Sequence, residues 1–113
     1  MKQTREIKED LTKELKRIVD IIIEEYSPQQ IILFGSLANG KVNEASDIDL
    51  VIIKDTKEKF MQRLHRLRLM THPKVGADFI VYTLKEIEQM KKENRAFLIK
   101  EILEKGEVLY ERN

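Results

Sequence analysis

Apolar residues recur at helical spacing near the start of the chain. Between Thr4 and Tyr26 they occupy Ile7, Leu11, Leu15, Ile18, Val19, Ile22 and Ile23. A repeat of about three to four residues predicts one amphipathic helix over 4–26, because such positions fall on one helical face. Ser27-Pro28 ends this helix, since proline disfavours helical backbone in the residue before it.

Three later runs have the apolar content and the length of β-strands. They cover residues 31–34, 47–53 and 78–82. Side chains alternate between the two faces of a strand, so Asp47 and Asp49 are expected on one face of the second run. The other face of that run is entirely apolar.

The next helix is expected over 57–70, after a turn at 54–56. Four apolar residues are predicted to face inward: Phe60, Met61, Leu64 and Leu67. The outer face is predicted to be basic, with Glu58 as its one acid beside Lys57, Lys59, Arg63, Arg66 and Arg68. This face has two interpretations, a solvated surface or a surface that binds a partner or steers phosphates.

The last part of the chain carries recognisable boundaries. Thr83 and Glu86 have the spacing of a capping box, which predicts a helix from Leu84 that Asn94 interrupts. A further amphipathic helix is expected to carry Phe97, Leu98, Ile102 and Leu103 and to stop at Gly106. Residues 108–110 are then predicted to form an edge strand.

The resulting order is helix, strand, short helix, strand, helix, strand and helices. It predicts an α+β protein in which helices flank a small mixed β-sheet. The chain has 113 residues and no stretch that reads as a linker. We therefore expect a single domain over 1–113.

Composition narrows the classes of function. The net charge of +1 argues against a general nucleic-acid binder. The absence of cysteine excludes disulfides and thiolate chemistry and suits a reducing cytoplasm, which is the expected location. No window approaches the apolar length of a membrane span, and the first residues are charged rather than signal-like, so no membrane partner is expected.

The candidate chemistry begins with the two carboxylates of the second strand. Asp47 and Asp49 repel each other when ionised, and placing them against a buried strand is costly without a positive partner. Nothing basic within the strand supplies that partner. Mg²⁺ can, because it is commonly held by one or two carboxylates together with phosphate oxygens of a substrate.

The first strand ends at a turn that suits phosphates. Gly35 allows a sharp turn and a close approach of the backbone to a ligand. Ser36 offers a hydroxyl and an N–H at the start of a short helix, where anions bind well. Gly40 gives a second permissive point before the chain returns to Asp47. Together these stretches predict a site for a metal-bound triphosphate.

These residues carry a resemblance to a known family. Gly35-Ser36, Ala38, Gly40 and residues 46–50 (Ser-Asp-Ile-Asp-Leu) resemble the signature of the polymerase-β-like nucleotidyltransferases, and more narrowly of the minimal nucleotidyltransferases. Members of that family have a third carboxylate on a later strand, and Asp78 within 77–82 fits this position. Members often carry arginines beside the Gly-Ser, where this chain has Leu37 and Asn39. Lys41 is the candidate to take over part of the phosphate contact.

The resemblance implies roles for the matching residues. Asp47, Asp49 and Asp78 are expected to be catalytic and to bind two Mg²⁺ ions, with Mn²⁺ as an alternative. Asp78 is expected to help remove a proton from the attacking hydroxyl. Gly35, Ser36 and Lys41 are expected to hold the phosphates of ATP or another nucleoside triphosphate.

The resemblance also implies a partner. The leading interpretation is transfer of AMP to a hydroxyl of a protein, as the antitoxin of a pair with a HEPN-type ribonuclease toxin. One alternative is an antitoxin or regulatory module that binds without catalysis. Another is nucleotidyl transfer to a small-molecule hydroxyl across a homodimer cleft, and a homo-oligomer is compatible with each of these.

Overall fold

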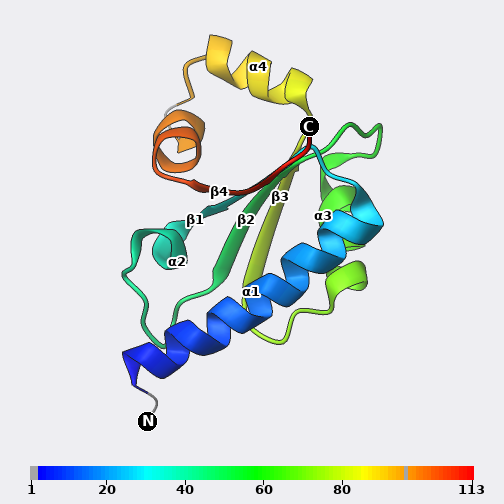
Figure 1. The fold of residues 1–113 in the computed structure, drawn as a ribbon. Coiled ribbons are helices and arrows are strands. Elements are labelled where there is room, and N and C mark those ends of the chain that lie inside the picture. The colour runs from blue at the N-terminus through cyan, green and yellow to red at the C-terminus, as the bar shows by residue number, and fades with distance from the viewer. Residues whose placement is uncertain (1–2, 96) are drawn as a thin grey trace.

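The four strands form one mixed sheet in the order β3-β2-β1-β4 (Figure 1). The computed structural model describes residues 3–95 and 97–113. The strands are β1 (Gln30–Phe34), β2 (Ile48–Ile53), β3 (Ala77–Tyr82) and β4 (Glu107–Glu111). β1 runs antiparallel to β2 and β4, whereas β2 and β3 are parallel. The predicted mixed sheet, its three apolar strands and the edge strand near the end of the chain are therefore confirmed, and β3 lies at the other edge.

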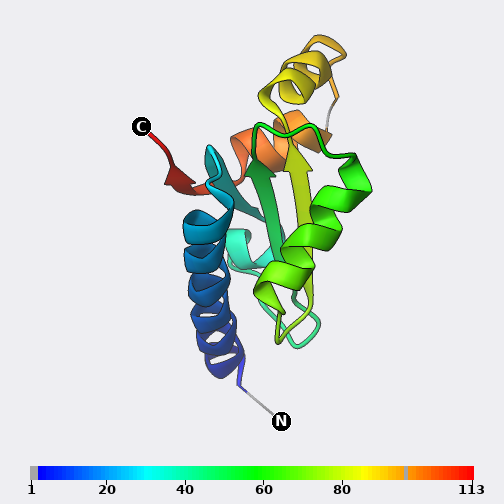
Figure 2. The same ribbon diagram turned by 90° about the vertical axis from the view of Figure 1, so that its right-hand side faces the viewer.

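Helices cover both faces of this sheet. The long α1 (Thr4–Tyr26) and α3 (Phe60–Thr71) lie side by side over one face (Figure 2). The other face is covered by α4 (Leu84–Lys92) and by η1 (Phe97–Glu104), a stretch of π-helix. The five-residue α2 (Gly35–Asn39) follows directly on β1. No helix within the described ranges is long and apolar enough to cross a membrane.

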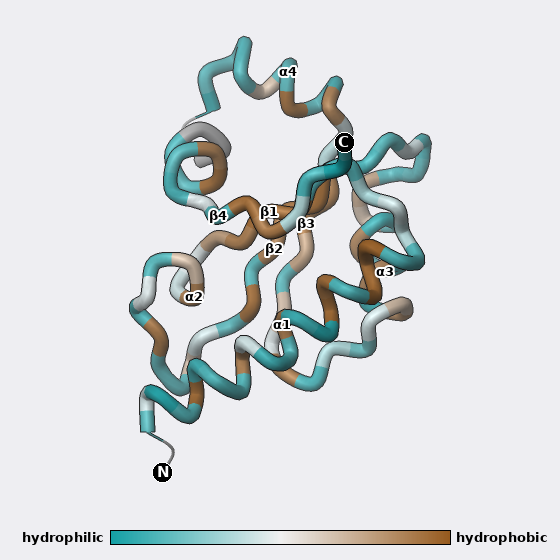
Figure 3. The backbone as a smooth tube through the Cα atoms, in the orientation of Figure 1, coloured by the Kyte–Doolittle hydropathy of each residue, from teal (hydrophilic) through white to brown (hydrophobic). Residues whose placement is uncertain are grey.

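The alternation along β2 produces two cores. Ile48, Leu50 and Ile52 pack toward α1 and α3, while Val51 and Ile53 pack toward the other face with Ile87 of α4 and Ile102 of η1. The hydropathy-coloured backbone shows apolar residues concentrated on the strands and on the inner sides of the helices (Figure 3). Because both faces are covered, β2 is nearly all apolar beyond its second residue, as a central strand requires.

The boundary predictions hold closely where local chemistry sets them. α1 spans the predicted residues, and Ser27 adopts a left-handed conformation just past its end. The Thr83–Glu86 capping box is present, since each residue's side chain bonds the other's backbone N–H. Asn94 has a positive φ of 54° just after α4. The predicted orientation of Phe97 and Leu98 lies outside the described side chains.

The prediction for α3 was wrong in part. The helix begins at Phe60, and Phe60 and Met61 are 44% and 67% exposed rather than buried. Leu67 is buried and Leu64 packs against the core, as predicted. The inner face also includes Arg63 and Thr71, each four residues from Leu67. Arg63 therefore does not belong to the outer basic face. The hydrophobic pattern gave a wrong prediction for Arg63, because a polar residue is expected on the outer face, whereas Arg63 is buried and hydrogen-bonded.

Candidate functional site

The parallel pairing of β2 with β3 brings two of the predicted carboxylates together. Asp49 and Asp78 are direct partners in the register of these strands. Asp49 also pairs with Phe34, the last residue of β1. β2 begins at Ile48, so Asp47 lies in the loop before the strand rather than within it. All three carboxylates thus gather at the end of the sheet where β1 ends and β2 and β3 begin.

The charges at this end are not balanced. The pKa of Asp49 is raised from 3.8 to about 6, first by burial and then by the nearby carboxylates of Asp78 and Asp47 and a hydrogen bond with Asp78. Side chains whose pKa is raised by burial and by like charges often mark functional sites, because a fold gains nothing from such crowding. The crowded carboxylates therefore mark this end of the sheet as a candidate functional site.

Gly35 is required by the position of Asp49. It lies between β1 and α2 with a φ of 76°, a conformation that L side chains rarely adopt. A Cβ atom built on Gly35 would collide with Oδ2 of Asp49. The turn therefore presents bare backbone to the carboxylate, and it is the absence of a side chain that lets the two approach.

The serine of the same turn is held in place by the loop before β2. Ser36 Oγ donates a hydrogen bond to Ser46 Oγ over 2.9 Å, and Ser46 Oγ also accepts one from the backbone N–H of Asn43 over 2.9 Å. The backbone N–H of Lys41 donates to the carbonyl of Ser36 over 3.1 Å, while the Lys41 side chain is exposed. The loop thus fixes Ser36 beside the carboxylates and leaves Lys41 on its rim.

Gly76 is a site residue that the sequence analysis missed. A Cβ atom on Gly76 would collide with Oδ1 of Asp47. The lack of a side chain at Gly76 therefore makes room for Asp47, just as Gly35 makes room for Asp49. Gly76 also accepts a hydrogen bond at its carbonyl from the N–H of Ile48 over 2.9 Å. The only sequence signal was a glycine two residues before Asp78.

Glu14 of α1 was also missed, although it holds the loop that carries Gly76. Its buried carboxylate accepts hydrogen bonds from Arg17 at 2.7 and 2.8 Å and from the backbone N–H of Lys74 at 2.6 Å. Arg17 in turn donates to the carbonyl of His72 over 3.1 Å. The hydrogen bond from Arg17 keeps the pKa of Glu14 below its ordinary value. The signal was an acid at an inward phase of an amphipathic helix.

The third carboxylate has a basic neighbour from α3. Arg68 Nη2 lies 3.9 Å from Oδ1 of Asp78 and donates a 2.7 Å hydrogen bond to the carbonyl of Ala77. Both side chains are largely exposed, at 46% and 66%. This contact places the positive charge of Arg68 on the side of the cluster where Asp78 is exposed to solvent.

Two hollows matter for binding. One of about 320 Å³ opens beside Asp47, and it is lined by Ile7, Asp10, Leu11, Glu44, Ser46, Asp47, Val75 and Gly76. A larger one of about 660 Å³ follows the outer surface of α3 and contains none of the three predicted catalytic aspartates. The end of the sheet that carries the three aspartates is the candidate site, because crowded titratable groups with a raised pKa are common at functional sites.

The donor chemistry at this end fits a hard divalent cation. All three predicted ligands are carboxylates, which Mg²⁺ prefers, and their mutual repulsion is what a cation would relieve. As the side chains stand, no group of three or more His, Cys, Asp or Glu within the described residues is arranged to hold a metal ion. Asp49 and Asp78 face each other across the strand pair, while Asp47 rests against Gly76.

Comparison with known proteins bears directly on this site. The family model described as Polymerase beta, Nucleotidyltransferase matches residues 16–113, which include the Gly-Ser turn and all three carboxylates. A protein of Methanocaldococcus jannaschii named "Putative protein adenylyltransferase" is 32% identical over 102 residues, covering 87% of this chain and 96% of that protein.

A solved structure supports the fold independently. The crystal structure described as a putative nucleotidyltransferase from Sulfolobus solfataricus superposes with a TM-score of 0.70. The match covers 99% of this chain and 90% of the other at 18% sequence identity. At that identity the likeness speaks for the fold, and it confirms the predicted arrangement of a small mixed sheet flanked by helices.

Proposed function

The chain belongs to the polymerase-β nucleotidyltransferase family, and from this premise we propose that it transfers AMP from ATP to a hydroxyl group of a protein partner. Its nucleotidyltransferase class follows from the family. The choice of AMP and of a protein acceptor is supported by the name of the Methanocaldococcus relative. The observation that carries the proposal is the half-buried Asp49, crowded by two like charges and set against the bare backbone of Gly35.

The triphosphate would bind at the turn after β1. Gly35 has no side chain to stand between the turn and Asp49, and the hydroxyl of Ser36 is already oriented by Ser46. Lys41 is exposed on the adjoining loop, and its ammonium group would form an ion pair with the phosphates. These groups would hold the β- and γ-phosphates and leave the α-phosphorus facing the carboxylates.

The chain's own residues would then direct a simple displacement. The acceptor oxygen attacks the α-phosphorus, the bond from that phosphorus to the bridging oxygen of the β-phosphate breaks, and pyrophosphate leaves. Asp78 is exposed toward solvent and would accept the proton of the acceptor hydroxyl. Mg²⁺ held by Asp47, Asp49 and Asp78, as one ion or two, would supply charge stabilisation at the phosphate oxygens, and Mn²⁺ is an alternative.

The acceptor must come from outside these elements. The described residues form one sheet and its covering helices, and the hollow beside Asp47 is small and open. A protein that presents a hydroxyl-bearing side chain to Asp78 suits such a site. Within this proposal the partner is a HEPN-type toxin, which the resemblance of the Gly-Ser and Asp-x-Asp residues to minimal nucleotidyltransferases implies.

The test is transfer of label from α-³²P-ATP with Mg²⁺ onto proteins of the source cell's lysate. Wild type is compared with Asp78→Asn, which removes the proposed proton acceptor. The matched control is Asp55→Asn, an exposed aspartate beyond the opposite end of β2. A parallel sample contains EDTA and is then supplied with excess Mg²⁺.

The proposal expects one labelled protein band with wild type and with Asp55→Asn. The band should disappear in Asp78→Asn and in EDTA, and it should return when Mg²⁺ is restored. Label on small molecules alone would overturn the protein acceptor. A band of equal strength in Asp78→Asn would overturn the assignment of the site.

A further inference from the structure

The outer side of α3 carries an unusual share of exposed apolar surface. Six large apolar side chains are exposed among the described residues, and three of them lie on this helix: Phe60, Met61 and Leu69. Met61 and Leu69 are 67% and 58% exposed. Such side chains occur singly on most surfaces, but a group on one short helix marks a contact area.

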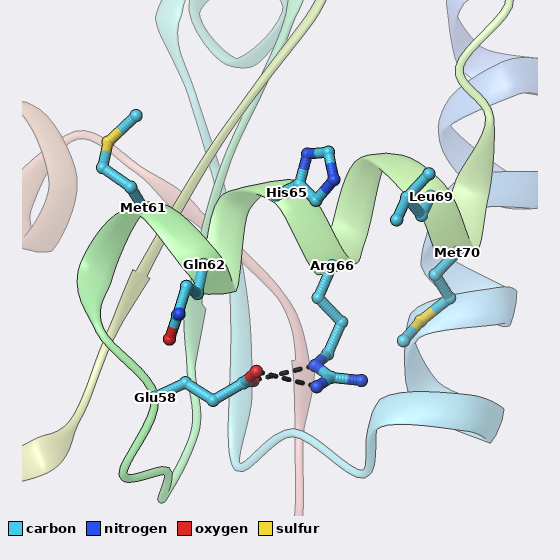
Figure 4. A pocket seen from close by; sticks show the side chains of 7 residues that line it. All are labelled: Glu58, Met61, Gln62, His65, Arg66, Leu69 and Met70. Carbon is cyan, nitrogen blue, oxygen red and sulfur yellow. Dashed lines mark hydrogen bonds and ion pairs between the residues drawn. The ribbon is translucent and has the colours of Figure 1, made fainter.

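Met61 and Leu69 line a groove along the helix. Figure 4 shows Met61, His65 and Leu69 along one side of α3, and Gln62, Arg66 and Met70 along the other. Each row advances by four residues, so the rows are two parallel ridges. Ridges of this kind accept the ridge of a second helix between them. The groove of about 660 Å³ is bounded by these six residues and Glu58.

Three of the residues that line the groove are apolar, namely Met61, Leu69 and Met70, and the surface around them is basic. Lys57, Lys59 and Arg68 are exposed beside it, and Arg66 lies within it. Glu58 is the one acid in this segment, and both of its carboxylate oxygens are bonded to Arg66, at 2.8 and 2.7 Å. The surface therefore keeps a net positive charge, which favours an occupant with acidic flanks.

The same charges argue against a second copy of this chain. In a symmetric dimer formed through this face, the middle of α3 would meet itself, so His65 and Arg66 would face their own copies. Lys57 and Lys59 would add to a basic surface on both sides. No acid beyond Glu58 lies on the groove to offset this repulsion.

We propose that the groove on α3 binds an amphipathic helix of the protein acceptor, with an apolar row seated between the two ridges and Asp or Glu residues on its flanks. Met61 and Met70 suit this role, because flexible thioether side chains adapt to the shape of a partner. The inference rests on the proposed protein acceptor and adds where that protein is held.

The groove leads toward the catalytic end of the sheet. Arg68 follows Leu67 and precedes Leu69 on α3, and its guanidinium reaches to within 3.9 Å of Asp78. A helix seated along α3 would therefore end beside the exposed Asp78. Docking there would bring a hydroxyl on an adjoining segment of the partner to the proposed site of transfer.

The first test measures binding without catalysis. The probe is a synthetic helix of about 20 residues with a leucine row flanked by glutamates, and its counterpart has lysines in place of the glutamates. Anisotropy titrations use wild type, Leu69→Glu and the matched control Leu84→Glu, in which an exposed leucine of α4 is changed. We expect the glutamate probe to bind, and Leu69→Glu to weaken it about tenfold or more. The control should bind as wild type does.

The second test uses the acceptor identified by its AMP label. Leu69→Glu should raise the KM for this acceptor about tenfold and leave the rate at saturating acceptor nearly unchanged. Equal effects of Leu69→Glu and Leu84→Glu, or equal binding of both probes, would overturn the docking site. So would a wild-type dimer that Leu69→Glu dissociates in sedimentation, because the groove would then be an interface between copies.

The two proposals fail in distinguishable ways. If no protein is labelled but the glutamate probe binds in the groove, the transfer proposal fails and the groove remains a docking site. If a protein is labelled equally well by Leu69→Glu and wild type at low acceptor concentration, transfer stands and the groove is overturned.

Discussion

Arg63 and Asp49 are charged residues with restricted exposure near opposite ends of the same sheet, and they differ in whether neighbouring groups compensate their charge. Arg63 of α3 is only 7% exposed, and its guanidinium donates to the carbonyls of Glu58 and Val81 at 2.8 and 3.0 Å and to Glu86 at 2.7 Å. Asp49 is half-buried between Asp47 and Asp78, and its surroundings raise its pKa to about 6.

The difference separates a structural charge from a functional one. Burial alone would raise the pKa of Glu86, but hydrogen bonds from Arg63 and Thr83 bring it below its ordinary value, so that pair is compensated. Among the described residues no opposite charge lowers the pKa of Asp49 in this way; it lies against two carboxylates and the glycine turn at Gly35. An uncompensated buried charge is costly, and it is retained where a substrate or cation completes it.

The comparison is tested most strongly by removing the charge of Asp49. Asp49→Asn keeps the shape of the side chain but should lower nucleotidyl transfer about a thousandfold, because a charged ligand at the reacting phosphate is lost. Initial rates of labelling from α-³²P-ATP measure this, with Asp55→Asn as the control. A loss of less than about tenfold would place the reaction elsewhere.

Removing Arg63 should instead damage the fold. Arg63→Ala removes a hydrogen-bond donor from Glu86, which keeps the N–H of Thr83, and from the carbonyl of Val81. The loss of these bonds should lower the free energy of unfolding by about 2 kcal/mol. The matched control is Arg66→Ala, whose ion pair with Glu58 lies on the surface with 54% and 29% of the two side chains exposed. That change should cost less than about 1 kcal/mol. Urea denaturation compares the two, and equal losses would contradict a structural role for Arg63.

The glycine beside Asp49 offers a paired test of close approach. Gly35 and Gly40 both have positive φ, at 76° and 80°, but a Cβ would collide with Asp49 only at Gly35. Gly40→Ala should cost about 1 kcal/mol of stability from backbone strain alone. Gly35→Ala should cost about 1–2 kcal/mol more and should also lower transfer, because Asp49 must move. Equal stability and equal activity of the two variants would remove the argument for contact.

The smallest expected effect is a dependence of stability on pH. Between pH 3.8 and about 6 the native Asp49 holds more proton than the unfolded one, so its contribution makes the protein less stable as pH rises through this window. After allowance for solvent screening, the loss by pH 7 should be about 1 kcal/mol.

Asp49→Asn provides the control for this pH effect, because it cannot titrate. We therefore expect the urea midpoints of variant and wild type to be close at about pH 4.5. At about pH 7 the midpoint of the variant should be higher, because only wild type carries the unfavourable charge. Glu14 has the opposite effect, because its pKa is lowered in the folded protein. Its ionised carboxylate stabilises the fold above pH 4.5, and this contribution is lost as the pH falls through the lowered pKa. A constant difference between wild type and variant would contradict the crowding of Asp49.

The sequence by itself determined the elements whose signals are local. The apolar period of α1, the alternation along β2 and the capping box of Thr83 and Glu86 each act within a few residues, so the pattern predicts them directly. The Gly-Ser turn and the Asp-x-Asp run could be recognised for the same reason. Asp78 was chosen because the family resemblance implies a third carboxylate from a later strand, and the structure pairs it in register with Asp49.

Tertiary structure alone decided which charges meet. Arg63 was predicted to lie on the outer basic face, because a pattern of polar and apolar residues cannot show that it donates hydrogen bonds to Glu86 of α4 and to the carbonyl of Val81 of β3. Glu14 and Gly76 lie 62 residues apart in number, yet they shape one loop beside Asp47 through contacts of side chain with backbone. Such contacts join segments distant in the chain, and their energies depend on burial and orientation, which no local period encodes.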